Sequence, residues 1–333
     1  MKKLLKHKVL CVFLGLLLSI VLFFVVINVI PPVKSIDENP FIIEKGAKPM
    51  IAAHRGGKNL NPENTFKAID YAVESCHIDI LEMDVCLTKD FHLVLAHNLT
   101  LDAYANVPTQ DYKISGHTLE ELEQLNMGYR FQKNGEFLYR DILENVDPSE
   151  YREVLVENGL KIVTINELFA KYANTELKYI IEIKNSGALG KLAAKRLTEA
   201  AKEYGVEKKI VIGTFHDDVE AELKTKYSDF MRGASLSVAR DFVVTQLFRV
   251  NIFDDSDFHA LQIPTSYELK GQEIDLTMKN IIRRAHRRNI SVQYWTINDK
   301  EEMRYLIEQG ADFIMTDAPD VMYELLVEMG YYN

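Results

Sequence analysis

Five residues with the chemistry of hydrolytic catalysis lie in or next to strand-like segments of this chain. Two are histidines, His54 and His97, and three are the carboxylates Glu82, Asp84 and Glu182. Carboxylate oxygens are the ligands that hard divalent cations prefer, and imidazoles exchange protons near neutral pH. Such a set contains what metal-assisted cleavage of a phosphodiester requires.

The spacing of Glu82 and Asp84 predicts that their side chains share one face of a strand. Two adjacent anions inside a sheet repel each other, and a bound cation relieves that repulsion. With Glu182 from a following strand, the all-oxygen set favours one Mg²⁺ or Ca²⁺ ion over zinc. An ion pair with a lysine of the sheet, Lys184 for example, is the alternative use of these carboxylates.

Two basic side chains accompany the predicted catalytic groups. Arg55 and Lys184 are predicted to contact a phosphate, and two imidazoles flanking that phosphate could act as base and acid. Trp295 is predicted to line the pocket, with core packing as its alternative, and for His216 the two uses are balanced. The remaining histidines of the body are predicted to be ordinary surface or core residues: His77, His92, His117, His259 and His286.

Bringing these residues together requires elements that place distant segments at one edge. Beyond residue 48, apolar strand candidates alternate with amphipathic stretches, which is the pattern of β/α units around a parallel sheet. We therefore predict a TIM (β/α)8 barrel, in which functional side chains gather at the carboxyl ends of the strands. The predicted strands are 50–54, 80–85, 179–184, 210–215, 233–238, 260–264, 291–297 and 313–316.

Two segments do not fit the alternation. Residues 93–97 follow the second strand too closely for a helical crossover, so they are predicted to form an antiparallel hairpin with it. Residues 102–162 are predicted to be an insertion over the barrel mouth. Within them, Thr118 and Glu121 have the spacing of a capping box at the start of a helix.

The N-terminal segment predicts a single transmembrane anchor. Residues 1–8 contain four lysines, and the uncharged stretch 9–30 is long enough to cross a bilayer as a helix. A cleaved signal peptide is the alternative, although its apolar region is usually only about 7 to 15 residues long. The lysines predict a cytoplasmic N-terminus and an extracytoplasmic domain. Residues 31–48 are the predicted linker, and 49–333 the barrel domain.

The net charge of the chain limits the classes of partner that it is expected to bind. The four lysines of residues 1–8 contribute +4 to a net charge of −10, which leaves −14 on residues 9–333. An acidic body argues against binding nucleic acid, and the sequence implies no protein partner. Cys76 and Cys86 are predicted to be core thiols, with a disulfide between them as the alternative.

Short motifs follow one another in order from about Met50 to Asp320. They are His54-Arg55-Gly56, Pro62-Glu63-Asn64-Thr65, Glu82-Met83-Asp84-Val85, Thr88-Lys89-Asp90, His97, Glu182-Ile183-Lys184, Trp295-Thr296-Ile297-Asn298 and Thr316-Asp317-Ala318-Pro319. Together they resemble the glycerophosphodiester phosphodiesterase family, over nearly all of the predicted domain.

The resemblance implies a TIM barrel, one divalent cation and hydrolysis of glycerophosphodiesters to an alcohol and glycerol 3-phosphate. It also implies an attack by the substrate's own 2-hydroxyl in many members. Carried over to this chain, it implies roles for residues already singled out above. His54 and His97 would be the acid–base pair, Glu82, Asp84 and Glu182 the metal ligands, and Arg55 and Lys184 the phosphate contacts.

The chain departs from the family pattern at three places. Asn98 replaces the usual aspartate after the second histidine, where a carboxylate could orient the ring or raise its basicity. Phe91 replaces a glycine, and Thr214-Phe215-His216 replaces a Ser-Phe pair. These changes bear on rate and substrate preference more than on the class of reaction.

Other functions stay open at this point. A phospholipase D-like or lysophospholipid-cleaving enzyme of the same fold is favoured by the anchor, but the body shows no evident apolar or basic docking stretch. A metal-bearing, inactive binding domain is suggested by Asn98. A glycosidase using Glu82 and Glu182 would leave Asp84, Arg55 and the histidines without a role.

Overall fold

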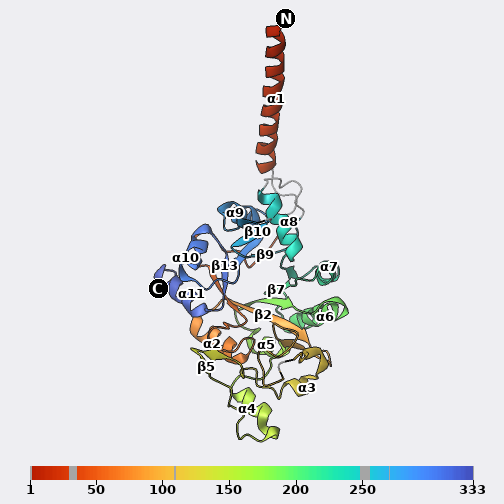
Figure 1. Cartoon of the computed structure of the whole chain (residues 1–333), viewed down its shortest axis with the longest axis vertical. Helices are drawn as coiled ribbons and strands as arrows, with labels where there is room; N and C mark the ends of the chain where they lie inside the picture. Colours follow the sequence, from red (N-terminus) through yellow and green to blue (C-terminus); the bar gives the residue numbers. More distant parts are fainter. Residues whose placement is uncertain (1, 30–35, 109, 248–255, 270, 333) are drawn as a thin grey trace.

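Eight parallel strands surround the core of the computed structural model, which describes residues 2–29, 36–108, 110–247, 256–269 and 271–332. Their order around the sheet is β8-β7-β6-β2-β1-β13-β12-β9. A parallel bridge between Gly233 and Ala260 joins the two edge strands, so the sheet nearly closes. Helices alternate with these strands along the chain (Figure 1), and the predicted (β/α)8 barrel is confirmed.

The bounds of the barrel elements agree with most of the predicted ranges. The strands are β1 Met50–His54, β2 Ile80–Leu87, β6 Lys178–Ile183, β7 Ile210–Gly213, β8 Met231–Arg232, β9 Ala260–Ile263, β12 Ser291–Tyr294 and β13 Phe313–Thr316. The helices are α2 Phe66–Cys76, α5 Ile165–Tyr172, α6 Gly187–Glu203, α7 Asp217–Lys226, α8 Leu236–Leu247, α9 Lys279–His286, α10 Lys300–Gln309 and α11 Pro319–Glu328.

The predicted strand 233–238 is wrong. Strand β8 ends at Arg232, and α8 begins at Leu236. A short apolar run does not distinguish a strand from a buried helix, and here the buried positions recur with helical spacing. They are Ala239, Phe242, Val243 and Gln246.

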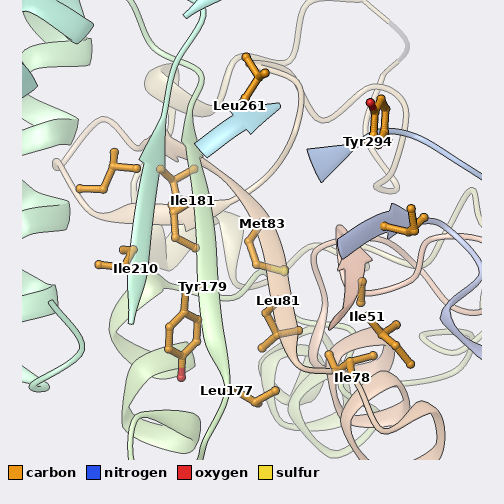
Figure 2. Packing of buried hydrophobic residues seen from close by; sticks show 14 of the residues in the cluster. Ile51, Ile78, Leu81, Met83, Leu177, Tyr179, Ile181, Ile210, Leu261 and Tyr294 are labelled. Atoms are coloured by element: carbon orange, nitrogen blue, oxygen red, sulfur yellow. The ribbon is translucent and has the colours of Figure 1, made fainter. Parts of the chain in front are cut away.

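Side chains alternate between the inside and the outside of the barrel with the period of two expected for strands. Met50 and Ala52 of β1 belong to the cluster inside the barrel, whereas Ile51 and Ala53 pack between strands and helices. In β2, Leu81 and Met83 pack outward with the helices (Figure 2). Glu82 and Asp84 therefore share the inner face, as the spacing predicts.

The second strand carries the predicted hairpin and the insertion. Strand β3 Leu93–Leu95 pairs antiparallel with β2, which confirms the hairpin. The capping box of Thr118 and Glu121 is present at α3 Leu119–Leu122. The rest of the insertion comprises short elements: η1 Ile114–Gly116, β4 Gln132–Lys133, β5 Glu136–Phe137, η2 Pro148–Glu150 and α4 Tyr151–Glu157.

The two thiols of the body do not form a disulfide. Cys76 and Cys86 are both buried and free, so the disulfide alternative is wrong and the prediction of core thiols is confirmed. Burial raises the pKa of the Cys76 thiol to about 11, with a smaller contribution from Asp320. Burial raises the pKa of Cys86 as well, so both thiols are protonated near neutral pH.

Helix α1, Lys2–Val29, projects from the barrel beside α8 and α9 (Figure 1). Its part Lys6–Val29 is long and apolar enough to cross a membrane, by length and composition. Residue 30, the last of the predicted span, lies outside the described residues. Near the C-terminal end of α1, the Asn28 side chain accepts a hydrogen bond from Arg284. The backbone carbonyl of Asn28 accepts one from Arg287 at 2.8 Å.

Residues 36–48 differ from the predicted linker, because they pack against the amino-terminal end of the barrel. Phe41 is fully buried inside it against Phe313, with ring centroids 6.4 Å apart. The Asn39 amide donates to the carbonyls of His259 and Asn289, each at 2.7 Å. Residues 36–48 of the predicted linker are part of the folded body, and its residues 31–35 lie outside the described residues.

Candidate active site

All eight predicted site residues line one cavity of about 190 Å³ inside the barrel. They lie on or next to the carboxyl halves of neighbouring strands, where a parallel barrel collects side chains from distant segments. They are His54, Arg55, Glu82, Asp84, His97, Glu182, Lys184 and Trp295.

The three carboxylates form the acidic part of this cavity. Glu82, Asp84 and Glu182 each offer an oxygen within 4.8 Å of the others. The parallel register of β2 and β6 sets this arrangement, because it places Asp84 directly beside Glu182. Glu82 and Asp84 are buried, so water screens their repulsion poorly.

Burial and neighbouring charges shift the pKa values of the three carboxyl groups in different directions. Burial, together with Asp84 and Glu182, raises the pKa of the Glu82 carboxyl well above its usual range. Burial would also raise the pKa of Asp84, but the Lys184 ammonium and the Arg55 guanidinium outweigh it and lower that pKa. For Glu182, burial again raises the pKa, and Lys184 opposes the rise. Asp84 is therefore the carboxyl group of the three whose charged form its surroundings favour most.

This donor set fits a divalent cation. Three carboxylate oxygens within reach of one another are hard ligands suited to Mg²⁺ or Ca²⁺. The pKa of Glu82 is raised by burial and by the negative charges of Asp84 and Glu182, and a bound cation would offset these effects. Glu82, Asp84 and Glu182 would hold it.

Lys184 makes the ion pair that the sequence left as an alternative. Its ammonium lies 2.6 Å from Glu182 Oε1 and 2.9 Å from Asp84 Oδ1. Burial opposes its charge, yet these two carboxylates raise its pKa. Lys184 is thus a fixed cation at the edge of the acidic cluster, and a phosphate contact stays a prediction.

Arg55 is oriented by two glutamates, Glu63 and Glu82. Its guanidinium lies 3.1 Å from Glu63 Oε1, and its backbone N–H donates to Glu82 Oε2 at 3.0 Å. Its φ of 52° belongs to the left-handed region, which costs energy for a residue with a side chain. Asn64 also supports the site, because its amide donates to Asp84 Oδ2 at 3.3 Å.

His54 has a carboxylate partner that sequence reasoning missed. Its Nδ1 lies 2.5 Å from Asp317 Oδ1, at the far end of the chain. The Asn298 side chain donates to the other Asp317 oxygen at 3.0 Å and accepts from the Asp317 backbone N–H at 2.9 Å. The signal was present in the motifs around Trp295 and Thr316, whose polar residues had no assigned role.

His97 has an amide partner instead. Its Nδ1 lies 2.9 Å from Asn98 Oδ1, so Nδ1–H can donate to the residue that departs from the family pattern. Burial lowers the pKa of His97, and nearby Lys184 and Arg55 add to this effect while Asp84 opposes it. Asn98 thus orients the ring without adding a negative charge.

The other residues considered in the sequence differ in whether they line the cavity. Trp295 is half-buried at the cavity and packs 6.2 Å from the Phe215 ring, between ring centroids. His216 occupies the N-cap position of α7, where its Nε2–H donates to the Lys184 carbonyl at 3.1 Å, and it lies outside the cavity lining. No described residue of the insertion 102–162 lines the cavity, and none of the five ordinary histidines does.

The fold and the cavity define a parallel (β/α)8 barrel with an acidic cluster and two imidazoles at its carboxyl-terminal rim. The model of the glycerophosphoryl diester phosphodiesterase family matches residues 54–321. The chain belongs to this family.

Three comparisons place the chain among its relatives. A glycerophosphodiester phosphodiesterase of Caldanaerobacter subterraneus is 26% identical, over 85% of this chain and 100% of that protein. Human lysophospholipase D GDPD1 is 24% identical, over 82% of this chain and 85% of that protein. The solved phosphodiesterase domain of a Mycobacterium tuberculosis protein has a TM-score of 0.66 at 17% identity, covering 83% of this chain and 98% of that domain.

Proposed function

We propose that this protein is a cation-dependent hydrolase that cleaves glycerophosphodiesters to an alcohol and glycerol 3-phosphate, using two histidines. The convergence of His54, His97 and the three carboxylates in one cavity carries the proposal. Membership of the family supports the reaction class.

The partners of the two imidazoles suggest which one donates the proton. Asp317 pairs with Nδ1 of His54 and holds the ring in place, and we assign His54 as the acid that protonates the leaving alcohol. His97, whose pKa is lowered, is neutral near pH 7 and acts as the base. His97 takes the proton of the hydroxyl that attacks phosphorus, while the bond between phosphorus and the oxygen of the leaving alcohol breaks.

The remaining residues hold the phosphate. A divalent cation bound by Glu82, Asp84 and Glu182 would supply positive charge to a phosphate oxygen. Arg55 and Lys184 add fixed positive charge at the same cavity, and Trp295 forms an apolar wall for the glycerol or alcohol part.

The proposal predicts that His54→Ala and His97→Ala each lower turnover of glycerophosphodiesters a hundredfold or more, on the order expected for lost acid–base catalysis. EDTA should abolish the activity, and one added cation should restore it. His92→Ala is the matched control, since this exposed histidine lies outside the cavity. The readout is release of alcohol from a panel of glycerophosphodiesters.

Three results would contradict parts of this proposal. Full activity in both histidine variants would exclude the acid–base assignment. Release of alcohol that persists in EDTA would exclude the cation dependence, and no turnover with any cation would favour a binding domain.

We also propose that α1 is an uncleaved anchor that holds the enzyme on the outer face of a membrane. Its length and apolar composition support the span, and the lysines before it support a cytoplasmic N-terminus. Substrates would then be phosphodiesters derived from lipids or envelope polymers.

A further inference from the structure

A second cavity, of about 320 Å³, opens directly off the candidate active site. It lies between α8 and the hairpin formed by β10 Ser266–Leu269 and β11 Gln272–Asp275. The two cavities share four lining residues: Phe215, Ala234, Gln262 and Trp295. A group bound beside the carboxylates can therefore extend into this second cavity past Trp295.

The second cavity is mainly apolar, unlike the first. Among the described residues that line it, the polar or charged ones are Asp217, Ser237, Arg240 and Gln262. At its rim, Leu236 is 63% exposed, Tyr267 43% and Val244 40%. Exposed apolar side chains around a hollow are typical of a surface that receives an apolar ligand. No such docking stretch was evident from the sequence, in which residues 233–238 were predicted to be a strand although α8 begins at Leu236.

The apolar lining continues toward the anchor. Leu247, at the end of α8, lines both the second cavity and a third, of about 680 Å³. The third cavity is bounded by apolar residues of α1, such as Phe24, and by Arg283, Arg284 and Arg287 at the C-terminal end of α9. Figure 1 shows α8 and α9 at the end of the body from which α1 projects.

The arginines of α9 indicate where lipid head groups would lie. They flank the C-terminal end of α1, where Asn28 accepts hydrogen bonds from Arg284 and Arg287. Basic residues next to a span attract the phosphates of a membrane surface. The body is acidic elsewhere, so these cations mark this end as the one that faces lipid.

We propose that the substrate is a lysophospholipid, whose acyl chain occupies the second cavity while its phosphodiester lies at the carboxylates. This inference rests on the proposed function and specifies its substrate. Water adds across the bond between phosphorus and the head-group oxygen. The hydroxyl joins phosphorus and the proton joins the alcohol, which leaves an acylglycerol phosphate.

The experiment compares full-length enzyme in nanodiscs on substrate pairs that share a head group, such as lysophosphatidylcholine and glycerophosphocholine. The lysophospholipid should show a kcat/KM at least tenfold higher. Leu236→Asp and Val244→Asp should lower only this value, fivefold or more, since both lie outside the catalytic cavity. Val327→Asp, on α11, is the matched control because Val327 is 44% exposed, close to the exposure of Val244.

A second measurement does not depend on turnover. Trp295 is the single tryptophan of the chain and lines both cavities. In the His97→Ala variant, a lysophospholipid with a brominated acyl chain should quench its fluorescence more than the unbrominated lipid does. Val244→Asp should reduce that quenching.

The outcomes separate the two proposals. Cleavage of glycerophosphocholine with no preference for its acylated partner, and equal fluorescence with both lipids, would overturn the acyl site alone. Equal effects of the α8 variants and of Val327→Asp would also overturn it. Failure to cleave either member of any pair, with Mg²⁺ or Ca²⁺ present, would overturn the proposed function itself.

Discussion

The two imidazoles of the site differ in the acceptor that each one faces. Asp317 offers His54 a carboxylate, whereas Asn98 offers His97 only an amide oxygen. A carboxylate stabilises imidazolium, and an amide does so less well. Asn98 therefore keeps the proposed base neutral down to lower pH than an aspartate would, so its presence does not argue for an inactive domain.

Substitution of Asn98→Asp tests this interpretation. A carboxylate beside Nδ1 should raise the pKa of His97, and the acid limb of the kcat/KM profile should move to higher pH, by about one unit. Asn98→Ala, which removes the acceptor, should lower kcat without that shift. An unchanged pH profile in Asn98→Asp would show that His97 does not set the acid limb.

The segment 36–48, which precedes the first strand, is part of the folded barrel domain. Phe41 closes the amino-terminal end of the barrel interior, at the opposite end from the catalytic cavity. A tightly packed aromatic side chain contributes strongly to stability, because replacing it with a smaller residue leaves a cavity. The segment 36–48 is therefore held at a fixed point under the barrel rather than serving only as a spacer.

Phe41→Ala should cost about 3–5 kcal/mol of folding free energy, the range for a fully buried phenylalanine. Phe41→Leu should cost less, because it leaves a smaller void. Thermal unfolding of the full chain in detergent measures both. Equal melting temperatures for wild type and Phe41→Ala would mean that the barrel is closed without this residue.

His259, next to β9, ties stability to pH. Burial, with help from Arg232, lowers the pKa of its ring to about 4. The unfolded chain takes up a proton below about pH 6.5, while the folded chain does so only near pH 4. Acidification through this window therefore favours unfolding, and the stability present above it is lost as pH falls.

His259→Gln should flatten that pH dependence between about pH 6.5 and 4, where one proton changes the free energy of unfolding by about 1.4 kcal/mol per pH unit. Denaturant titrations at several pH values measure the slope. The control is His92→Gln, at an exposed position. Parallel slopes in wild type and His259→Gln would contradict the lowered pKa.

The complete chain combines an apolar helix, a basic end and an acidic barrel. Arg283, Arg284 and Arg287 lie beside α1, whereas residues 9–333 carry a net −14. On the proposed membrane this asymmetry would orient the body, because the basic end would be attracted to lipid phosphates and the remaining surface repelled by them.

The anchor predicts a definite topology. Protease added to intact cells should digest the barrel, and full-length chain should stay with membranes after alkaline extraction. A cytoplasmic protein is the control for cell integrity. A barrel protected from protease would reverse the proposed orientation, and a mature N-terminus beyond residue 30 would identify a cleaved signal peptide.

Local pattern was sufficient for much of this protein. Alternation predicted seven of the eight barrel strands and the shared face of Glu82 and Asp84, because side-chain direction in a strand depends only on neighbouring residues. The hairpin was predictable for a similar reason, since a short connection excludes a crossover. Motifs then led to eight residues that line one cavity.

Contacts between residues far apart in the sequence could be found only from the tertiary structure. Asp317 meets His54 from 263 positions away, and Phe41 meets Phe313 beneath the strands. The apolar cavity exists because α8 lies against the β10–β11 hairpin beside Trp295. Such contacts depend on how the first and last β/α units meet when the sheet closes, and no local periodicity carries that information.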